Sequence, residues 1–357
     1  MTLLSRRRKL ILVLGNGAAG AEKQALALAS KVQAYLPTEE NVSVAMSRVP
    51  YSSRFFARLP PIAHVLFARS TNNPWIGYAH PLPNEAPDIV IGCGRSTVAL
   101  CAGLKQAFPQ VFNIQIQHPR TFLYHFDAII TPQHDFPSCP PPQNVYLTPG
   151  TICDISPKSL ASARQQWRHS VEESWASYPH RKIAVLIGGS CRGYSLTLER
   201  AQHLVQHLQK VGATAPITLL VTFSRRTPHD VAAFLHHELP LKFSSSYIWD
   251  GHGENPFMGF LSHADAIITT PDSISMTTEA IVTGKPTFVF DMAQCKGKFK
   301  AFHEHLKSNH LAAPLDDLDA MALGNTISYA SRQETMDAGV VPALVDAMSR
   351  RWTQLTL

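Results

Sequence analysis

The fold is decided by residues 182–228, which read KIAVLIGGSCRGYSLTLERAQHLVQHLQKVGATAPITLLVTFSRRTP. The stretch opens with a continuous apolar run that ends in two glycines, which is typical of a buried parallel strand entering a tight turn. Apolar residues at helical spacing follow over 197–211, and a second apolar run covers 217–224. A strand, a helix and a strand in this order predict a βαβ unit with a parallel sheet.

The same alternation continues toward both ends of the chain. In the second half, strands are expected at 246–251, 265–270 and 286–292, with helices at 228–239, 256–263 and 273–283. In the first half, strands are expected at 9–15, 41–46, 87–94, 111–117, 126–131 and 144–150, with helices around 24–32 and over 96–107. Residues 151–181 read as a polar connecting helix, and the tail 316–356 reads as helical.

Two α/β units in series predict two Rossmann-like domains that face each other across a cleft. We expect an N-terminal domain over 1–165, a second domain over 166–335, and a C-terminal helix, 336–357, that crosses back to the first domain. In open α/β sheets, ligands bind outside the carboxyl ends of the strands. The polar clusters described below all follow strands, which favours a small-molecule site between the domains.

Composition fits a protein with two full cores. The chain has 357 residues, of which 45% are hydrophobic and 16% are charged, which excludes a disordered protein. Its six cysteines form no C-x-x-C pair, which argues against a zinc ribbon or a disulfide framework and favours a cytoplasmic, reducing compartment. There is no apolar stretch of about 18 residues to cross a membrane. The basic start resembles a signal peptide, but its apolar run is too short, so we interpret it as a tail before the first strand.

The net charge of +6 is unevenly placed. Residues 1–180 hold 16 Lys and Arg against 10 Asp and Glu, whereas residues 181–357 hold 16 of each. No acidic residue occurs from Asn41 to Asn84, where four arginines alternate with aromatic and aliphatic residues. This composition suits a peripheral contact with anionic lipid headgroups. An arginine-bearing helix packed on its own domain explains it equally well, and nucleic acid is a weaker alternative because no nucleic-acid-binding motif accompanies it.

A glycine-rich motif follows the first strand. Residues 15–20, GNGAAG, match the G-x-G-x-x-G pattern of dinucleotide-binding turns. The acidic partner that such a site needs would follow the second strand, but Glu39 and Glu40 precede it. We therefore favour an acceptor-binding turn at Gly17 and Gly20 over a dinucleotide site, and a purely structural turn remains an alternative.

Two clusters in the second half suit an anion. Gly188, Gly189 and Ser190 follow a strand, and glycines allow backbone N–H groups to approach a phosphate. Ser224, Arg225 and Arg226 follow the next strand, and the arginine fork binds phosphate through two hydrogen bonds. We expect both arginines to be exposed and to hold the same anion. A structural turn and a solvated arginine pair are the alternatives.

Two further clusters complete the predicted donor site. Glu254 and Asn255 lie in the polar loop DGHGENP, 250–256, which could contact a base or a sugar. In the segment TPDSISMTTEA, 270–280, the turn and the first helical positions carry Asp272, Ser273, Ser275 and Met276. Their N–H groups could hold a diphosphate, and Glu279, on the same helical face, could accept two ribose hydroxyls. A plain helix-capping role for Asp272 or Ser273 is the alternative.

A transfer reaction also needs a base for the acceptor hydroxyl if it inverts the anomeric centre. The candidates at strand ends of the first domain are His118, His134 and Asp135. Histidine has a suitable pKa, although a histidine is more often structural.

Nearly the whole chain resembles the elongated-mitochondria family of plant mitochondrial-fission factors and their bacterial relatives, which are related to GT-B glycosyltransferases. The segments that carry the resemblance include GNGAAGAEKQALALA (15–29), GCGRSTVAL (92–100), IQIQHPR (114–120), VLIGGSCRGY (185–194), TFSRRTP (222–228) and the long run 247–286. The family pattern has Asp-Pro-Arg where this chain has His118-Pro119-Arg120, and Asp-Gly where it has Asn16-Gly17. If either family Asp were the base, this chain would use another group.

The resemblance implies a GT-B-like enzyme that moves a sugar from a nucleoside-diphosphate-sugar to a glycan or lipid-linked acceptor at the cytoplasmic membrane face. The second-half clusters would bind the donor, and the acceptor side would include Gly17, Gly20, Gly94, Arg95 and Arg120. GT-B enzymes generally need no metal, so no metal and no cofactor are expected. The alternatives are a non-catalytic adaptor on the same fold, as the fission label suggests, and a nucleotide-sugar epimerase.

Overall fold

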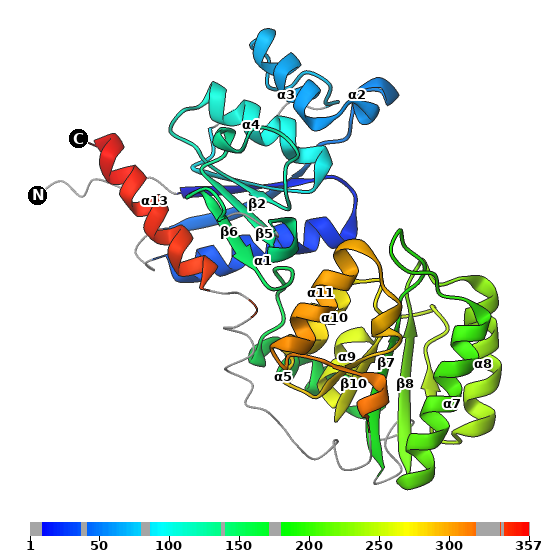
Figure 1. The fold of residues 1–357 in the computed structure, drawn as a ribbon. Helices are drawn as coiled ribbons and strands as arrows, with labels where there is room; N and C mark the ends of the chain where they lie inside the picture. The colour runs from blue at the N-terminus through cyan, green and yellow to red at the C-terminus, as the bar shows by residue number, and fades with distance from the viewer. Residues whose placement is uncertain are drawn as a thin grey trace, which may run out of the picture. The chain divides into compact units, whose positions relative to one another are not determined.

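The computed structural model describes residues 9–36, 41–79, 86–136, 140–170, 180–318, 336 and 339–356, which form two compact units (Figure 1). The first unit runs to Asp154 and takes in the C-terminal helix, and the second runs from Ile155 to Met336. The division lies ahead of the boundary expected at 165/166 because helix α5 (Pro157–Gln166) packs on α9 (Phe257–His263) of the second unit. The connecting residues 171–179 lie outside the described residues.

The first unit is built on a parallel six-stranded sheet in the order β2-β1-β3-β4-β5-β6. Its strands are β1 (Lys9–Gly15), β2 (Val42–Arg48), β3 (Ile89–Cys93), β4 (Phe112–Ile116), β5 (Ala128–Pro132) and β6 (Val145–Thr148). All residues of β3 and β4 are buried, which agrees with the apolar sequence of β3, whereas β4 also buries two polar residues, Asn113 and Gln115. The strand order reverses between β1 and β3, which is the switch point of this sheet.

Helices cover both faces of this sheet. They are α1 (Ala19–Tyr35), α2 (Arg54–Arg58), α3 (Pro61–Ser70), α4 (Val98–Ala107) and α13 (Val340–Thr356), with short 3₁₀ turns η1 (Arg95–Thr97), η2 (Leu123–His125) and η3 (Gln133–Asp135). The C-terminal helix belongs to the first unit, where α13 lies along α1 (Figure 1). Leu344 and Met348 of α13 are fully buried in one cluster with Leu28 and Val32 of α1. The tail between α13 and Leu318 was expected to be helical and, apart from Met336 and Gly339, lies outside the described residues.

The second unit has a parallel six-stranded sheet in the order β12-β11-β10-β7-β8-β9. Its strands are β7 (Arg181–Ile187), β8 (Ile217–Phe223), β9 (Tyr247–Ile248), β10 (Ala266–Thr269), β11 (Thr287–Val289) and β12 (Ala313–Pro314). Counted from the first strand of the unit, this is the doubly wound order 3-2-1-4-5-6, whose switch point lies between β7 and β10. Strand β9 is shorter than the expected strand at 246–251, and β12 was not anticipated.

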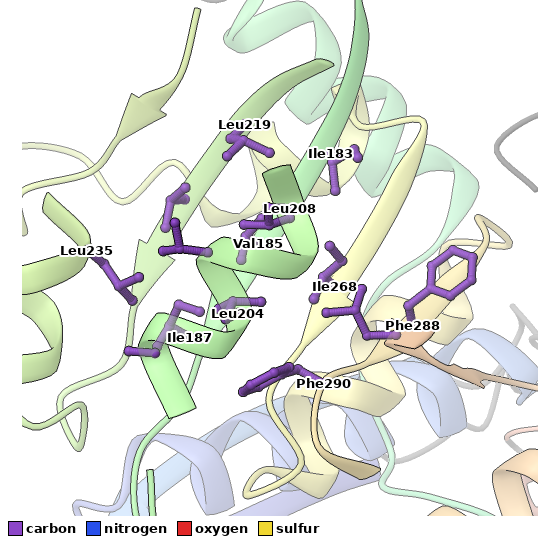
Figure 2. Close-up of a cluster of buried hydrophobic side chains, with 14 of the residues drawn as sticks. Ile183, Val185, Ile187, Leu204, Leu208, Leu219, Leu235, Ile268, Phe288 and Phe290 are labelled. Atoms are coloured by element: carbon purple, nitrogen blue, oxygen red, sulfur yellow. The ribbon is translucent and has the colours of Figure 1, made fainter. Parts of the chain in front are cut away.

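A core of buried apolar side chains holds the helices of the second unit on its sheet. The helices are α5, α6 (Arg168–Ser170), α7 (Leu198–Thr214), α8 (His229–Lys242), α9, α10 (Ile274–Val282) and α11 (Gly297–Ser308), with η5 (Met292–Gln294) and η6 (Leu315–Asp317). Leu204 and Leu208 on the inner face of α7 lie over Ile183, Val185 and Ile187 of β7 (Figure 2). Each such buried side chain contributes about 1.5–3 kcal/mol of transfer free energy. The two units confirm the predicted class of two Rossmann-like α/β domains.

Candidate functional site

Three strand-end turns meet at the switch point of the second sheet. The parallel register pairs Ile187 with Phe223 and Leu186 with Thr269, so the turns after β7, β8 and β10 leave the sheet side by side. Hydrogen bonds connect the three turns. The Gly188 N–H donates to Thr270 Oγ1 at 2.7 Å, and the Thr227 hydroxyl donates to the Gly188 carbonyl oxygen.

The two glycines of the first turn are required by this close approach. A Cβ atom on Gly188 would lie 2.0 Å from Asp272 Oδ1, and one on Gly189 would lie 2.1 Å from the backbone oxygen of Arg226. Neither glycine has a positive φ, so the lack of a side chain matters here rather than backbone freedom. The glycine pair therefore has a structural reason, whether or not a phosphate binds there.

Asp272 is the anchor of the three turns. Its side chain is fully buried; Oδ1 accepts from the Thr270 hydroxyl at 2.7 Å and Oδ2 from the Arg226 guanidinium at 2.9 Å. Burial raises the pKa of Asp272, although bonds from Thr270, the Gly189 N–H and Arg226 each favour the ionised carboxylate. Of the two residues considered as alternative helix caps, Ser273 caps α10 by accepting from the Met276 N–H at 3.3 Å, and Asp272 does not.

Arg225 and Arg226 are both exposed, as predicted, but they differ in their partners. Arg226 is half exposed but its guanidinium is held on Asp272, so its removal would leave a buried carboxylate without its cation. Arg225 is exposed beside it. Of the two arginines, Arg225 is the one whose substitution should leave the folded core intact.

The remaining donor candidates lie at the same edge of the sheet or further out. Ser275 and Met276 are in the first turn of α10, where the Met276 N–H already donates to the capping hydroxyl of Ser273. Ser190 is exposed, and its hydroxyl accepts from the Leu196 N–H at 3.0 Å, which closes its own loop. Glu279, one turn further along α10, is only 8% exposed, so it is more deeply placed than the sequence suggested.

The side chains of Glu254 and Asn255 form hydrogen bonds near the loop between β9 and α9. Asn255 Oδ1 accepts from the Phe257 N–H at 3.0 Å, which starts α9, and Glu254 Oε1 accepts from Gln166 of α5. Both therefore have local partners. Neither bonds to the three turns through any contact that the structure gives for the described residues.

In the first unit, the carboxylate of Glu22 is hydrogen-bonded to the glycine turn. Glu22, in the first turn of α1, accepts from the Gly17 N–H at 2.8 Å and from two nitrogens of Arg48, each at 3.0 Å. The Arg48 guanidinium, followed by the Gly17 N–H, holds the pKa of Glu22 below its usual value. This carboxylate takes up an N–H that the phosphate of a dinucleotide would need.

The switch point of the first sheet lies between β1 and β3. Gly94 has φ +79° and Gly17 has φ +79°, which favour glycine, and no atom lies within 4 Å of a Cβ on Gly17 or Gly20. Asn16 Nδ2 donates to Ser96 Oγ at 2.8 Å across the switch point. The guanidinium of Arg95 points to α2, where it donates to the backbone oxygens of Arg58 and Leu59 at 3.0 and 2.7 Å.

Two of the three candidate bases lie together at the ends of β4 and β5. Asp135 accepts from Thr131 Oγ1 at 2.5 Å and lies 3.6 Å from a guanidinium nitrogen of Arg120. His118 Nδ1 accepts from the Arg120 N–H at 3.0 Å, and the ring stacks on Phe136. Burial, followed by the charge of Arg120, lowers the pKa of His118. Because Nδ1 accepts a hydrogen bond, a neutral ring would carry its proton on Nε2. His134 is half-buried in η3 beside Asp135.

Glu22, Arg48, Thr227 and Thr270 were not predicted as site residues, although Thr227 and Thr270 lie inside two of the predicted clusters. The available signal was their position, because each lies within a few residues of a strand end or glycine turn already singled out. No group of three His, Cys, Asp or Glu side chains suited to a metal occurs in the part of the chain that the structure describes. Within the same residues, no helix has the length and apolar character to cross a bilayer.

Two doubly wound parallel sheets in series, each with polar turns at its switch point, define a GT-B-like α/β protein. A Neisseria meningitidis UDP-GlcNAc 2-epimerase structure has the same fold: its TM-score to this chain is 0.54 at 9% identity, with 96% of this chain and all of the epimerase covered.

The chain belongs to the family described as mitochondrial fission ELM1, which matches residues 19–339. It is 32% identical over 275 residues to the mitochondrial fission protein ELM1 of Arabidopsis thaliana, a match that covers 71% of this chain and 62% of the plant protein. It is also 31% identical over 262 residues to protein RP120 of Rickettsia prowazekii, with 63% of this chain and 71% of that protein covered. These matches confirm the family resemblance read from the sequence.

Proposed function

We propose that the protein binds a nucleoside-diphosphate-sugar at the switch point of its second sheet and transfers the sugar to an acceptor. The observation that carries the proposal is the position of an exposed arginine, Arg225, and of the start of helix α10 on strand-end turns at the same edge of one sheet. Helix N-termini and arginine forks are the groups that proteins use to hold a diphosphate. The Neisseria epimerase, which shares the fold, was solved bound to UDP-GlcNAc, which supports this ligand class.

In the proposed site, Arg225, Ser190 and the N–H groups of Ile274 and Ser275 at the start of α10 contact the diphosphate, and Glu279 receives the ribose hydroxyls. Glu254 and Asn255 lie in the loop that would border the base or sugar. The ion pair between Arg226 and Asp272 positions the turns. Arg226 stays bound to Asp272 when the ligand binds. Because the arginine and the helix dipole offset the charge of the leaving diphosphate, the proposed reaction needs no metal ion, and EDTA should leave it unchanged.

The reaction breaks the bond between the anomeric carbon and the diphosphate oxygen and forms a bond to an acceptor hydroxyl, whose proton passes to a base. Among the three candidates, Asp135 is favoured as the base, since a carboxylate can take a proton while His118 already uses Nδ1 as an acceptor. Arg120 lies against Asp135 and would hold its orientation. Gly17, Gly94 and Arg95 border the acceptor side, and a glycan or lipid-linked acceptor at the cytoplasmic membrane face fits the basic first unit.

The test is a thermal-shift screen with UDP, GDP, ADP, CMP and dTDP, followed by calorimetry on any nucleotide that stabilises the protein. A ligand at about 100 times its Kd should add about 2.7 kcal/mol to the free energy of unfolding. Arg225→Ala should then weaken binding roughly ten- to a hundred-fold, because it removes a charge-assisted bond of about 1.5–3 kcal/mol. The matched control is Arg54→Ala, an exposed arginine of the first unit. The proposed site would be contradicted if none of the five nucleotides stabilised the protein, or if Arg225→Ala and Arg54→Ala weakened nucleotide binding equally.

The family name favours a second candidate, a non-catalytic adaptor on the same fold. The two are separated by following release of the nucleoside diphosphate from the matching nucleotide sugar in the presence of a membrane lipid extract. Acceptor-dependent release supports the transferase. Release or isomerisation of the sugar without any acceptor supports an epimerase, and tight binding without turnover supports the adaptor.

A further inference from the structure

The first unit carries an exposed apolar and cationic surface on α2 and α3. Four large side chains are open to solvent here: Phe55 is 63% exposed, Leu66 50%, Phe67 42% and Ile62 38%. Arg54 and Arg58 flank Phe55 on α2. We refer to these six residues as the α2–α3 surface. Monomeric proteins seldom leave such a contiguous group of apolar side chains in water without a function.

Helix α3 is well packed on its other side. His64, Val65 and Ala68 are buried, and α3 packs along α4. A helix that packs on its own domain, the simpler interpretation of the sequence window 41–84, therefore accounts for the inner face of α3 only. The outer face, with Ile62 and Leu66 one helical turn apart, has no such explanation.

The α2–α3 surface has a firm base. A column of aromatic rings runs from the core outward: Tyr51 and His64 stack on Tyr78 at 5.5 and 5.3 Å, Phe56 lies 5.3 Å from His64, and Phe67 lies 6.0 Å from Phe56. The carbonyls at the end of α2 are held by Arg95. The exposed side chains are thus presented by a fixed scaffold, which lowers the entropy lost when they are buried against a partner.

The charge of this region selects the partner. No Asp or Glu occurs between residues 41 and 84, and neither Arg54 nor Arg58 forms an ion pair with another described residue. Arg54, Phe55, Arg58, Leu59 and Pro60 line a hollow of about 370 Å³. Guanidinium groups that alternate with phenyl rings match the boundary of a bilayer, where phosphates lie above acyl chains.

Exposed aromatic side chains continue beside this surface. Arg69 at the end of α3 contacts His125 Nδ1 at 3.1 Å, which joins α3 to η2. Next to His125, Tyr124 is 75% exposed and Phe122 39%. Aromatic side chains with a polar tip, such as Tyr124, prefer the headgroup region of a membrane.

We propose that the α2–α3 surface docks the protein on an anionic lipid bilayer, with Phe55, Ile62, Leu66 and Phe67 entering the headgroup boundary and Arg54 and Arg58 bound to lipid phosphates. This inference goes beyond donor binding and rests on the first unit alone, so it can fail while nucleotide binding succeeds, and the reverse. A protein with an acidic, apolar face and a nucleic acid are the other occupants that the test must detect.

The experiment is flotation of the full-length chain with vesicles of phosphatidylcholine alone or mixed with phosphatidylglycerol. Binding is expected only to the mixed vesicles, and added salt should weaken it. Arg54→Gln with Arg58→Gln should lower the partition coefficient by roughly ten- to thirty-fold, from about 1 kcal/mol for each cation near the membrane. Phe55→Ala with Leu66→Ala should lower it by a similar factor, with unchanged salt dependence of the residual binding. Thermal melts check that all four side chains, being exposed, can be replaced without loss of folding.

Two matched controls come from the second unit. Leu241→Ala removes an apolar side chain that is 70% exposed, and Arg225→Ala removes an exposed arginine. Both should float like the unchanged protein, and Arg225→Ala should lose only nucleotide binding. The proposal is overturned if anionic vesicles fail to bind, if the controls lose as much binding as the α2–α3 variants, or if those variants instead abolish self-association or binding to a duplex oligonucleotide without affecting flotation.

Discussion

In both units a glycine turn follows the first strand, and in both a carboxylate of the same unit lies against it. In the first unit the carboxylate is Glu22, which comes from the helix that follows the turn, and its partner Arg48 ends the neighbouring strand β2. In the second unit the carboxylate is Asp272, which lies in the turn after β10 across the switch point, and its partner Arg226 follows β8. The two arrangements use the same chemistry from different places in the sheet.

The difference lies in the depth of the two carboxylates. Each accepts one N–H of its glycine turn, Glu22 that of Gly17 and Asp272 that of Gly189. Glu22 pairs with Arg48, whose side chain is 66% exposed, whereas the Asp272 side chain is fully buried beneath the turns. Because a buried carboxylate depends more on its partners than a solvated ion pair does, we expect the turn of the second unit to be the more firmly anchored.

The largest expected effect is on the free energy of unfolding when a glycine of each glycine-rich motif is replaced by alanine. Gly189→Ala should destabilise the protein by about 3 kcal/mol or more, because the new Cβ would meet the Arg226 backbone at 2.1 Å and cannot be relieved by a side-chain rotation. Gly20→Ala, in helix α1 with no atom within 4 Å of the new Cβ, should stabilise it by about 0.5–1 kcal/mol. Urea unfolding measures both. Equal effects of the two substitutions would show that the turns are not packed differently.

The next largest effect is the loss of stability near neutral pH when each of the two carboxylates is replaced by its amide. Asp272→Asn should lower the free energy of unfolding by about 1–3 kcal/mol, since an amide cannot accept from both Thr270 and Arg226 while its NH₂ faces donors. Glu22→Gln should cost clearly less, because the Arg48 guanidinium is mostly in water and can be solvated instead. Denaturant midpoints at constant slope report both values. A larger loss from Glu22→Gln would reverse the assignment of which turn is anchored.

The smallest expected effect is the change with pH in the stability cost of these two substitutions, which should have opposite signs. The pKa of Glu22 is lowered from 4.5, so its ionisation contributes stability that is present above pH 4.5 and is lost as pH falls through the folded pKa. The pKa of Asp272 is raised from 3.8, so its ionisation contributes nothing below pH 3.8 and lowers stability as pH rises through the folded pKa. The cost of Glu22→Gln should therefore grow with rising pH, and the cost of Asp272→Asn should shrink. Unfolding of each variant from acid to neutral pH gives the two slopes, and slopes of one sign would refute the distinction.

The strands and the glycine turns could be predicted because their signals are local. The run KIAVLIGG becomes β7 and its turn, and the 3.6-residue spacing after Thr197 becomes α7, where apolar residues at that spacing face the sheet. The strand β12 escaped prediction because two residues carry no periodicity. The base candidates were placed at strand ends, but the tautomer of His118 depends on the Arg120 N–H and no pattern announces it.

The sequence by itself determined the class of fold and the positions at which chemistry can occur, because apolar periodicity and glycine turns act over neighbouring residues. The tertiary structure decided which of these positions are partners. Arg226 and Asp272 are 46 residues apart in the chain and meet only because β7 lies between β8 and β10. Strand order results from the burial of whole sheets and helices together, so a hydrogen bond across it cannot be read from either residue alone.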